Sequence, residues 1–254
     1  MKIIRFRYED RDRIGALEGD RITELDGPLD ALKPAAGARP IALSAVRLLA
    51  PATPGKIVAV GVNYRDHAKE MGRELPAEPM LFIKPSTAVI GPQDGIVYPP
   101  QTRRLDYEGE LAIVIARTAK NVEEKDARRY VLGYTCMNDV TARDLQRLDV
   151  QFTRAKGFDT FAPLGPVIET DLDPSDLQIE TRLNGETRQR SRTANLIFGC
   201  DYLVSFISRI MTLVAGDVIS TGTPSGVGPM QVGDTVEVEI EKIGCLRNTV
   251  VAPR

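Results

Sequence analysis

The chain has 254 residues, of which 43% are hydrophobic and 27% are charged, a composition typical of a globular protein that can bury a core. A formal net charge of -2 provides no basic field for nucleic acid or anionic lipid, and no apolar run reaches the length of a membrane span. The N-terminus carries too many charges for a signal peptide, and three widely spaced cysteines suit a reducing compartment. We therefore expect a cytoplasmic protein, with neither nucleic acid nor a membrane as its partner.

The first 50 residues have the pattern of a small β-rich domain. Three short segments alternate apolar and polar side chains, and turn-forming residues separate them. A proline-punctuated stretch around Pro51 then ends the pattern. We therefore predict a small N-terminal domain, residues 1–50, and a larger domain, residues 51–254. The strands of the small domain are expected at residues 2–6, 13–17 and 21–25.

The larger domain combines many strands with a few helices and shows no regular βαβ order. Asn63 is expected to cap a short helix over residues 64–71, which Gly72 would end. The dipeptide Asn184-Gly185 predicts a tight hairpin. Strands outnumber helices, so we predict an α+β fold that is mostly β, with a mixed sheet and a few covering helices. Further strands are expected at residues 56–62, 81–83, 111–116, 134–140, 177–183, 186–189, 217–220 and 235–240, and further helices at residues 121–131, from residue 141 onward, and at residues 200–213.

Two glutamates precede the most apolar strand of the chain. Glu108 and Glu110 lie two positions apart, just before residues 111–116, and because side chains alternate along a strand both carboxylates point to one face. Asp106 joins them if the strand begins that early. Two such charges about 4 Å apart repel by about 4 kcal/mol at an effective dielectric constant of about 20. A shared proton, an arginine or a divalent cation would offset this repulsion; the alternative is a solvated strand end with ordinary surface acids.

Asp139 supplies a third carboxylate near the end of the strand expected at residues 134–140. Hard carboxylate ligands without histidine or cysteine favour magnesium, manganese or calcium over zinc. An octahedral ion held by three protein oxygens keeps three positions for water or for a chelating substrate. The three acids together therefore indicate a divalent metal site.

His67 is the only histidine of the chain, so it alone can supply an imidazole base near neutral pH. Glu70 follows three residues later, on the same face of the expected helix. A carboxylate beside an imidazole fixes its tautomer and raises its basicity, which is the usual arrangement for activating water. The alternative is an exposed pair on an amphipathic surface helix.

Two basic residues lie close to these acids in the sequence. Lys156, among small and aromatic neighbours, can balance an enolate or a carboxylate, and Arg143 can clamp a substrate carboxylate. The alternatives are a surface lysine and an ion pair on a helix surface. The glycine-rich loop over residues 221–229 can approach an anion closely, but it lacks the P-loop and dinucleotide-binding patterns and can equally be a wide β-connection.

Six motifs, in their order along the chain, resemble the fumarylacetoacetate hydrolase family, in particular its bacterial acylpyruvase-like and hydroxymuconate-isomerase-like members. The resemblance runs from residue 51 to the C-terminus, and the first 50 residues resemble the small N-terminal domain of bacterial members. It implies a mixed β-roll for the catalytic domain and a homodimer. The motifs are Gly61-Val62-Asn63-Tyr64-Arg65-Asp66-His67, Phe82-Ile83-Lys84-Pro85-Ser86, Tyr107-Glu108-Gly109-Glu110-Leu111, Asn138-Asp139-Val140-Thr141-Ala142-Arg143-Asp144, Lys156-Gly157-Phe158-Asp159 and Thr221-Gly222-Thr223-Pro224-Ser225-Gly226-Val227-Gly228.

The resemblance also implies residue roles at the metal and the water. Glu108, Glu110 and Asp139 match the ligands of magnesium or manganese, with calcium as a substitute. His67 and Glu70 match a dyad that holds and deprotonates water, on a short helix that acts as a lid.

Five further residues match polar positions around the substrate. Lys156 and Gln146 match groups that surround the substrate and the attacking water. Arg143, Thr223 and Tyr64 match substrate-contacting positions.

The function implied is that of a magnesium-dependent hydrolase, which cleaves a carbon–carbon bond in a small 2-oxo acid of the acylpyruvate or fumarylpyruvate type, or a related dicarboxylate. The substrate would chelate the metal through its carboxylate and 2-oxo oxygens, while His67 and Glu70 activate water. Alternatives on the same site are isomerisation of 5-carboxymethyl-2-hydroxymuconate or 2-hydroxyhepta-2,4-diene-1,7-dioate type diacids, and decarboxylation of oxaloacetate. A metal-stabilised binding protein without turnover is a further alternative, but a binder needs no paired base.

Overall fold

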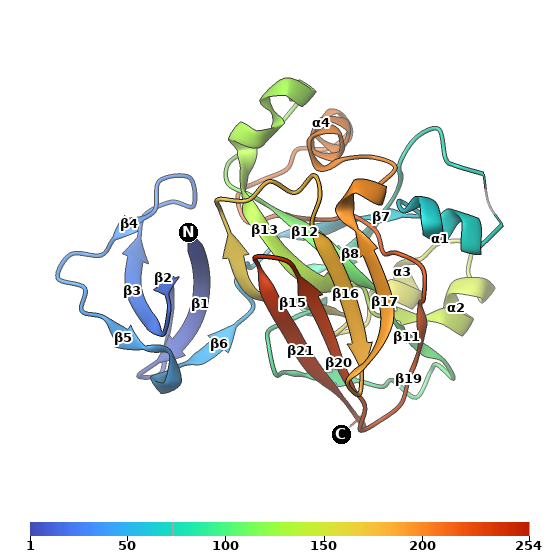
Figure 1. Cartoon of the computed structure of the whole chain (residues 1–254), viewed down its shortest axis with the longest axis horizontal. Coiled ribbons are helices and arrows are strands. Elements are labelled where there is room, and N and C mark those ends of the chain that lie inside the picture. Colours follow the sequence, from blue (N-terminus) through green and yellow to red (C-terminus); the bar gives the residue numbers. More distant parts are fainter. Residues whose placement is uncertain (73, 254) are drawn as a thin grey trace.

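The chain folds around one large mixed β-sheet, with the N-terminal strands at one end of it (Figure 1). The structure, a computed structural model, describes residues 1–72 and 74–253. The N-terminal elements are β1 (Lys2–Tyr8), β2 (Arg11–Glu18), β3 (Arg21–Asp26), β4 (Lys33–Pro34), β5 (Ile41–Ala42), the 3-10 helix η1 (Leu43–Ala45) and β6 (Arg47–Leu49).

Strands dominate the rest of the chain as well, which confirms the predicted mostly-β fold. Its strands are β7 (Lys56–Gly61), β8 (Met80–Pro85), β9 (Val89–Ile90), β10 (Gly95–Val97), β11 (Leu105–Tyr107), β12 (Gly109–Ile115), β13 (Val131–Asn138), β14 (Thr141–Ala142), β15 (Ala162–Glu169), β16 (Gln178–Leu183), β17 (Glu186–Arg192), β18 (Val218–Ser220), β19 (Gly228–Met230), β20 (Thr235–Ile240) and β21 (Gly244–Val251). Its helices are α1 (Arg65–Glu70), α2 (Arg143–Leu148), α3 (Thr153–Lys156) and α4 (Cys200–Ile210), and its 3-10 helices are η2 (Ser86–Ala88), η3 (Glu124–Tyr130) and η4 (Thr193–Asn195).

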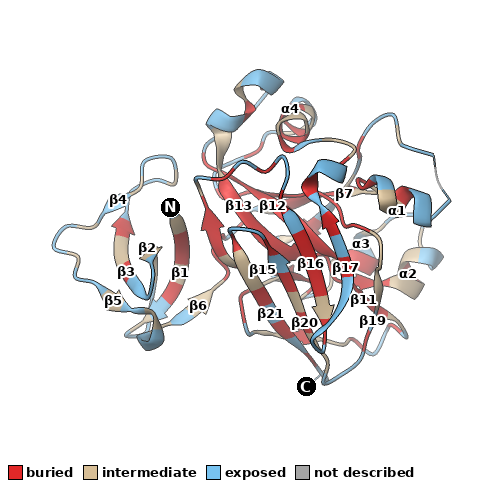
Figure 2. Ribbon diagram, viewed as in Figure 1, coloured by how far each residue is buried: buried red, intermediate tan, exposed pale blue. Residues whose placement is uncertain are grey.

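The strands form three sheets. In the 13-stranded sheet, ten strands run in the order β4-β3-β2-β1-β15-β13-β12-β18-β7-β8, and β5, β6 and β9 pair with β3, β1 and β15 beside this path. A 5-stranded sheet runs β10-β21-β20-β16-β17, and β14-β11-β19 form the third. The 5-stranded sheet lies across one face of the large sheet (Figure 1). In Figure 2 the central strands of both sheets are largely buried.

Strand β12 is buried on both faces, which explains its uninterrupted apolar sequence. Ile113 packs with Ile179 and Val238 of the 5-stranded sheet. Its neighbour Val114 points to the other face, into a second hydrophobic cluster that also contains Ile3 and Ile168. The predicted strand is therefore confirmed. Because it is buried on both faces, it holds the acidic residues at its start in a fixed position.

The N-terminal strands extend the large sheet. The three predicted strands are confirmed, and β1 pairs with β15 through Ile3 and Ile168. The N-terminal ammonium group also contacts Glu169 Oε1 at 2.8 Å. Residues 1–50 and the rest of the described chain therefore share one sheet and one hydrophobic core. The domain boundary near Pro51 stays a prediction.

The hairpin predicted at Asn184-Gly185 is confirmed, and it joins β16 to β17. Asn184 and Gly185 have φ values of 53° and 80°, the left-handed backbone that a two-residue hairpin turn of this type requires. No helix within residues 1–72 and 74–253 is long and apolar enough to cross a membrane. The expected cytoplasmic location stays a prediction.

Three local predictions were wrong. The segment around residues 121–131 forms only a 3-10 helix, because Asn121 has a φ of 51° and starts no helical turn. Asn63 does not cap α1, since its buried side chain bonds Phe198 and Thr221 instead. The long helix α4 ends at Ile210 rather than at residue 213. The strands β15 and β21 were not predicted.

Replacing Ile3 by alanine tests whether the N-terminal strands share one core with the rest. Ile3 is fully buried in the hydrophobic cluster that also contains Val114 and Ile168, so Ile3→Ala should lower the free energy of unfolding of the whole chain by about 2–5 kcal/mol. Urea denaturation should show a single transition. Val232→Ala is the control, because Val232 is exposed and its truncation should cost less than about 0.5 kcal/mol. A separate early transition would contradict a shared core.

Candidate active site

A cavity of about 400 Å³ opens among α1, α2, α3 and the edge strand β8. Acidic, basic and apolar side chains line it together. The charged residues of its wall are Arg104, Asp106, Glu108, Glu110, Asp139, Arg143, Arg147 and Lys156, joined by His67, Gln146 and Thr223, and the apolar wall includes Val62, Met71, Met80, Phe82, Phe152 and Val227.

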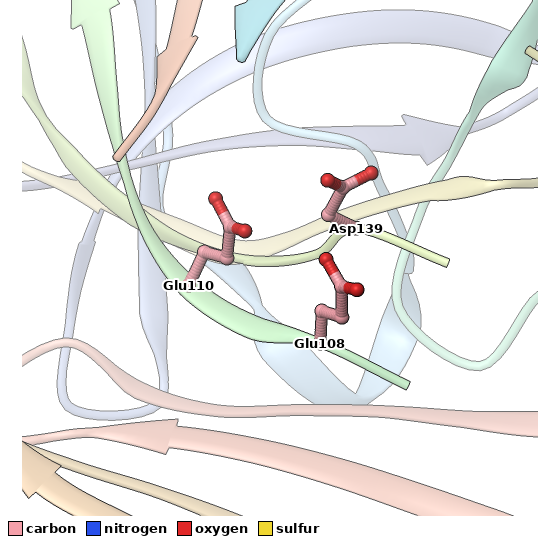
Figure 3. A group of neighbouring side chains, drawn as sticks. All are labelled: Glu108, Glu110 and Asp139. Carbon is pink, nitrogen blue, oxygen red and sulfur yellow. The ribbon is translucent and has the colours of Figure 1, made fainter. Parts of the chain in front are cut away.

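The three predicted carboxylates converge in this cavity (Figure 3). Glu108 lies in the break between β11 and β12, Glu110 is the second residue of β12, and Asp139 directly follows β13. Antiparallel pairing of Gly109 with Asn138 brings the two segments together. One oxygen from each carboxylate lies within 4.8 Å of the others, and all three residues are buried.

The backbone that carries the glutamates is held from two sides. The Glu108 N–H donates to Asn138 Oδ1 at 2.9 Å, and the Gly109 N–H donates to Gln189 Oε1 at 3.0 Å. A Cβ atom at Gly109 would lie 2.1 Å from Thr181 Oγ1. Only glycine therefore fits between the two glutamates without displacing β16.

Three buried or half-buried cations balance two of the three acids. Lys156 Nζ donates to Glu108 Oε2 at 2.7 Å and to Asp139 Oδ2 at 2.6 Å. Arg143 also contacts Glu108. Lys84 Nζ donates to Asp139 Oδ1 at 2.5 Å and to the Val140 carbonyl at 3.2 Å.

Lys84 is the residue whose role sequence reasoning missed. Its side chain is fully buried beside Asp139, where a lysine needs an acidic partner. It lies in a strand of otherwise apolar character, between Ile83 and Pro85. The feature of the sequence that could have identified Lys84 is a lysine within an otherwise apolar strand.

Burial and neighbouring charges shift the pKa values of Glu108 and Glu110 in opposite directions. Burial alone would raise the pKa of Glu108, but the charges of Lys156 and Arg143 outweigh it and lower the pKa to about 2. Burial raises the pKa of Glu110 to about 8, and the charges of Asp139 and Glu108 add to the effect. Burial also lowers the pKa of Lys84, although Asp139 opposes that shift.

This donor set fits a divalent cation. Glu110 accepts hydrogen bonds from Ser220 Oγ and from the Gly222 N–H, and no basic side chain of the described chain forms an ion pair with it. Glu110 is therefore a buried carboxylate without a basic partner, and a further positive charge would stabilise it. Oxygen ligands alone suit a hard ion such as magnesium, manganese or calcium.

His67 and Glu70 form the predicted pair on α1. His67 Nδ1 lies 2.9 Å from Glu70 Oε2, and the Gly226 N–H donates to Glu70 Oε1 at 3.2 Å. The histidine side chain is 15% exposed and lines the same cavity as the carboxylates. The structure therefore places His67 and the three carboxylates on the wall of one cavity.

The remaining predicted residues occupy different positions relative to the cavity. Arg143 and Gln146 line it, and Arg143 Nη1 donates to Gln146 Oε1 at 2.5 Å. Thr223 also lines it, but its hydroxyl donates to the Gly109 carbonyl and accepts from Gln189. Tyr64 does not line it: the ring is fully buried in the hydrophobic core. The catalytic and binding roles of these residues stay predictions.

Comparison with known proteins identifies the class of protein. Residues 56–251 match the family described as the C-terminal domain of fumarylacetoacetate (FAA) hydrolase, and residues 1–51 match a family described as Rv2993c-like, N-terminal. The chain belongs to the fumarylacetoacetate hydrolase family, as the resemblance indicated, and members of this superfamily are enzymes.

Three relatives show the range of named activities. The 5-carboxymethyl-2-hydroxymuconate delta-isomerase of Mycobacterium smegmatis is 46% identical, with a TM-score of 0.94 and full coverage of both chains. The maleylpyruvate hydrolase of Sphingobium, solved with manganese and pyruvate, is 31% identical, with a TM-score of 0.83 and full coverage of both chains. A mitochondrial oxaloacetate tautomerase of Bos taurus is 43% identical over 221 residues, which cover 82% of this chain and 70% of the relative. Because these reactions differ, family membership alone does not choose among them.

Removing the Tyr64 hydroxyl tests whether this residue contacts a substrate. The hydroxyl is buried and has no hydrogen-bond partner among the described residues, so Tyr64→Phe should leave stability unchanged or raise it by about 1 kcal/mol. Enzymatic activity and ligand affinity should stay within about twofold of the parent protein, since the ring lies outside the cavity wall. Urea denaturation and ligand calorimetry provide the measurements. A large loss of ligand affinity in a stable variant would restore the predicted substrate contact.

The acidic cluster should make the metal-free protein sensitive to pH. The folded-state pKa of Glu110, about 8, exceeds the value of about 4.3 for an unfolded glutamate. The resulting stabilisation is fully present below about pH 4.3 and is lost as the pH rises through about 8. In EDTA, Glu110→Gln should therefore gain stability over the parent protein between about pH 5 and about pH 9.

Urea denaturation across that pH range measures the effect. Glu123→Gln is the control, because the side chain of Glu123 is 67% exposed and its neutralisation should leave the pH profile unchanged. A stability difference between Glu110→Gln and the parent protein that stays constant with pH would contradict the raised pKa.

Proposed function

We propose that this chain is a divalent-metal-dependent hydrolase, with magnesium as the metal, which cleaves a carbon–carbon bond in a small 2-oxo acid of the acylpyruvate or fumarylpyruvate type. The observation that carries the proposal is the His67–Glu70 dyad, whose histidine lines the cavity that contains the three carboxylates. A base paired with an acid, placed beside a cluster of metal-ligating oxygens, is the arrangement that hydrolysis with an activated water requires.

The acidic cluster defines the end of the cavity at which the 2-oxo acid binds. A divalent metal held by Glu108, Glu110 and Asp139 would supply Lewis-acid polarisation of the 2-oxo group. Lys156 adds a buried ammonium group beside Glu108 and Asp139. A fixed positive charge at this point stabilises the negative charge that develops on an enolate oxygen as the carbon–carbon bond breaks.

The dyad positions water and deprotonates it as the water oxygen adds to the distal carbonyl carbon of the substrate. The carbon–carbon bond at that carbonyl then breaks and releases a carboxylic acid and the pyruvate enolate. With Nδ1 of His67 donating to Glu70, the Nε2 atom is the nitrogen that can take a proton from water. Glu70 is held in turn by the Gly226 N–H, which limits the orientations that the imidazole adopts. The proton accepted by His67 can then pass to the carbon of the leaving enolate, as general acid–base catalysis requires.

A second candidate function is isomerisation of a 2-oxo or 2-hydroxy diacid on the same site, and the names of the isomerase and tautomerase relatives favour it. Isomerisation and hydrolysis both need a proton acceptor and stabilisation of an enolate, but only hydrolysis needs a nucleophilic water. The two proposals therefore share His67 and Lys156 and differ in the product. Oxaloacetate decarboxylation, a third proposal, needs the Lewis acid more than the base.

Replacing His67 separates these reactions. His67→Ala should lower kcat/KM for acylpyruvate hydrolysis by about 10²–10⁴, which is the usual contribution of a positioned base, while oxaloacetate decarboxylation should be much less affected. Glu70→Ala should have a similar effect, and the double variant should be little worse than either, because the two residues act as a unit. The substrates are acylpyruvates, oxaloacetate and hydroxymuconate-type diacids, each assayed with magnesium and with EDTA, with product identification.

Lys69→Ala is the matched control, since Lys69 lies on the same helix and is exposed. It should retain full activity. Hydrolysis that survives in His67→Ala would reject the assigned role of the dyad. A parent protein that isomerises diacids but cleaves no acylpyruvate would replace the first candidate by the second.

A further inference from the structure

We propose that Gln189 is a positioning residue, which holds the two metal-ligating glutamates and the loop that contacts Glu70 in a fixed relative position. The inference rests on the proposed function in one respect: Glu108, Glu110 and Asp139 hold a divalent cation. It adds a residue outside the cavity wall, which acts through the groups that contact the cation and the water.

Gln189 is a polar side chain buried outside the cavity. It lies in β17, is only 1% exposed, and does not line the cavity. β17 is the last strand of the 5-stranded sheet, where Gln189 lies opposite Thr181 of β16. Side chains two positions apart on a strand share a face, and the Ser191 hydroxyl donates to Asp66 Oδ2 of α1 at 2.8 Å. This face of β17 is therefore directed at the elements that build the candidate active site.

The amide of Gln189 closes a ring of hydrogen bonds around Gly109, the residue between the two glutamates. Its Oε1 accepts from the Gly109 N–H at 3.0 Å, and its Nε2 donates to Thr223 Oγ1 at 2.8 Å. The Thr223 hydroxyl in turn donates to the Gly109 carbonyl at 2.9 Å. Both peptide units that join Glu108 to Glu110 are thereby bonded to side chains, so neither can rotate without breaking the ring.

The partners of the Gln189 amide fix its orientation. The Pro224 carbonyl can only accept a hydrogen bond, and Nε2 donates to it at 2.8 Å. The Gly109 N–H can only donate, so it needs the Oε1 atom. The position therefore requires an amide of this length: a glutamate lacks the two donor hydrogens, and a methionine of similar length forms none of the three bonds.

The Pro224 carbonyl connects Gln189 to the dyad. Two residues beyond it, the Gly226 N–H donates to Glu70 Oε1 at 3.2 Å, and Glu70 Oε2 lies 2.9 Å from His67 Nδ1. A single side chain therefore bonds both the segment that carries two of the metal ligands and the loop that orients the base.

This support affects how well the site binds a cation. The carboxylates of Glu108 and Glu110 repel each other, and a cation binds tightly only where the protein holds its ligands together in advance. Without the Gln189 amide, the Gly109 backbone would be free to turn, and the two carboxylates could separate. Groups that orient metal ligands typically contribute about 10- to 100-fold to metal affinity.

Titration with magnesium alone tests the proposal without any substrate. In calorimetry of the full chain, freed of metal with EDTA and then desalted, Gln189→Met should weaken Mg²⁺ binding by about 10- to 100-fold. Asn248→Leu is the matched control. Asn248 is another buried amide of the 5-stranded sheet, but its Nδ2 donates to the carbonyls of Gly91 and Asp94, outside the cavity. This variant should lose stability and still keep its Mg²⁺ affinity within about twofold of the parent protein.

The single histidine provides a second measurement, which the loss of a purely structural residue would not change. The nuclear magnetic resonance signal of the His67 Cε1–H group reports the contact with Glu70, and the chain has no other imidazole. In Gln189→Met this signal should move toward its position in Glu70→Ala, because the loop that holds Glu70 is loosened. In Asn248→Leu it should keep its position in the parent protein.

Thr223→Val opens the same hydrogen-bond ring at another member and provides the test if Gln189→Met does not fold. It should weaken Mg²⁺ binding as well, and the double variant should be little worse than Gln189→Met. An Mg²⁺ affinity within about twofold of the parent protein in either folded variant would overturn the proposal, as would equal weakening in Asn248→Leu.

The outcomes for Gln189 and for the proposed function can be told apart. Unchanged Mg²⁺ affinity in Gln189→Met, with acylpyruvate hydrolysis by the parent protein, would reject the role of Gln189 and keep the proposed function. Weakened Mg²⁺ binding in a protein that hydrolyses no acylpyruvate would support the role of Gln189 and reject hydrolysis.

Discussion

The mutual repulsion of three buried carboxylates is the constraint on which the rest of the site depends. Glu108, Glu110 and Asp139 lie within ligand distance of a common point, and in a medium of low dielectric constant such charges are costly unless they are paired. Lys84 and Lys156 provide part of the compensation from two different elements, β8 and α3. Asp139 pairs with both lysines, and Glu108 pairs with Lys156 and Arg143, so removing either lysine would weaken the compensation of a buried charge.

One loop connects the acidic cluster to the dyad. The Gly222 N–H donates to Glu110, and four residues later the Gly226 N–H donates to Glu70. Gly226 has a φ of +94°, and a Cβ atom there would lie 2.1 Å from the Arg188 carbonyl, so the loop passes close against β17. The backbone of this segment therefore fixes the distance between the metal-ligating end of the cavity and the base, which a more flexible connection would leave variable.

Sequence reasoning found the convergence of Glu108, Glu110 and Asp139 because each lies at the end of a strongly patterned strand, and strand alternation is a local property. It missed Lys84, whose importance arises only when β8 is placed beside Asp139. The family resemblance implied a substrate contact for Tyr64, and that role stays a prediction, while the structure places the ring in the hydrophobic core. The strands β15 and β21 also escaped notice, although each pairs with a strand close to it in the sequence, β13 and β20 respectively.

The distribution of charge explains how one family accommodates several reactions. The inner residues, Glu108, Glu110, Asp139 and Lys156, are buried and mutually dependent, so a change at any one of them disturbs the others. Under the proposed function, stabilisation of the enolate depends on this inner group. The outer wall has no such coupling: Arg147 is exposed and unpaired within the described chain, so it can change at little cost in stability. Differences in substrate are therefore expected to arise in the outer wall, while the chemistry is constrained by the inner one.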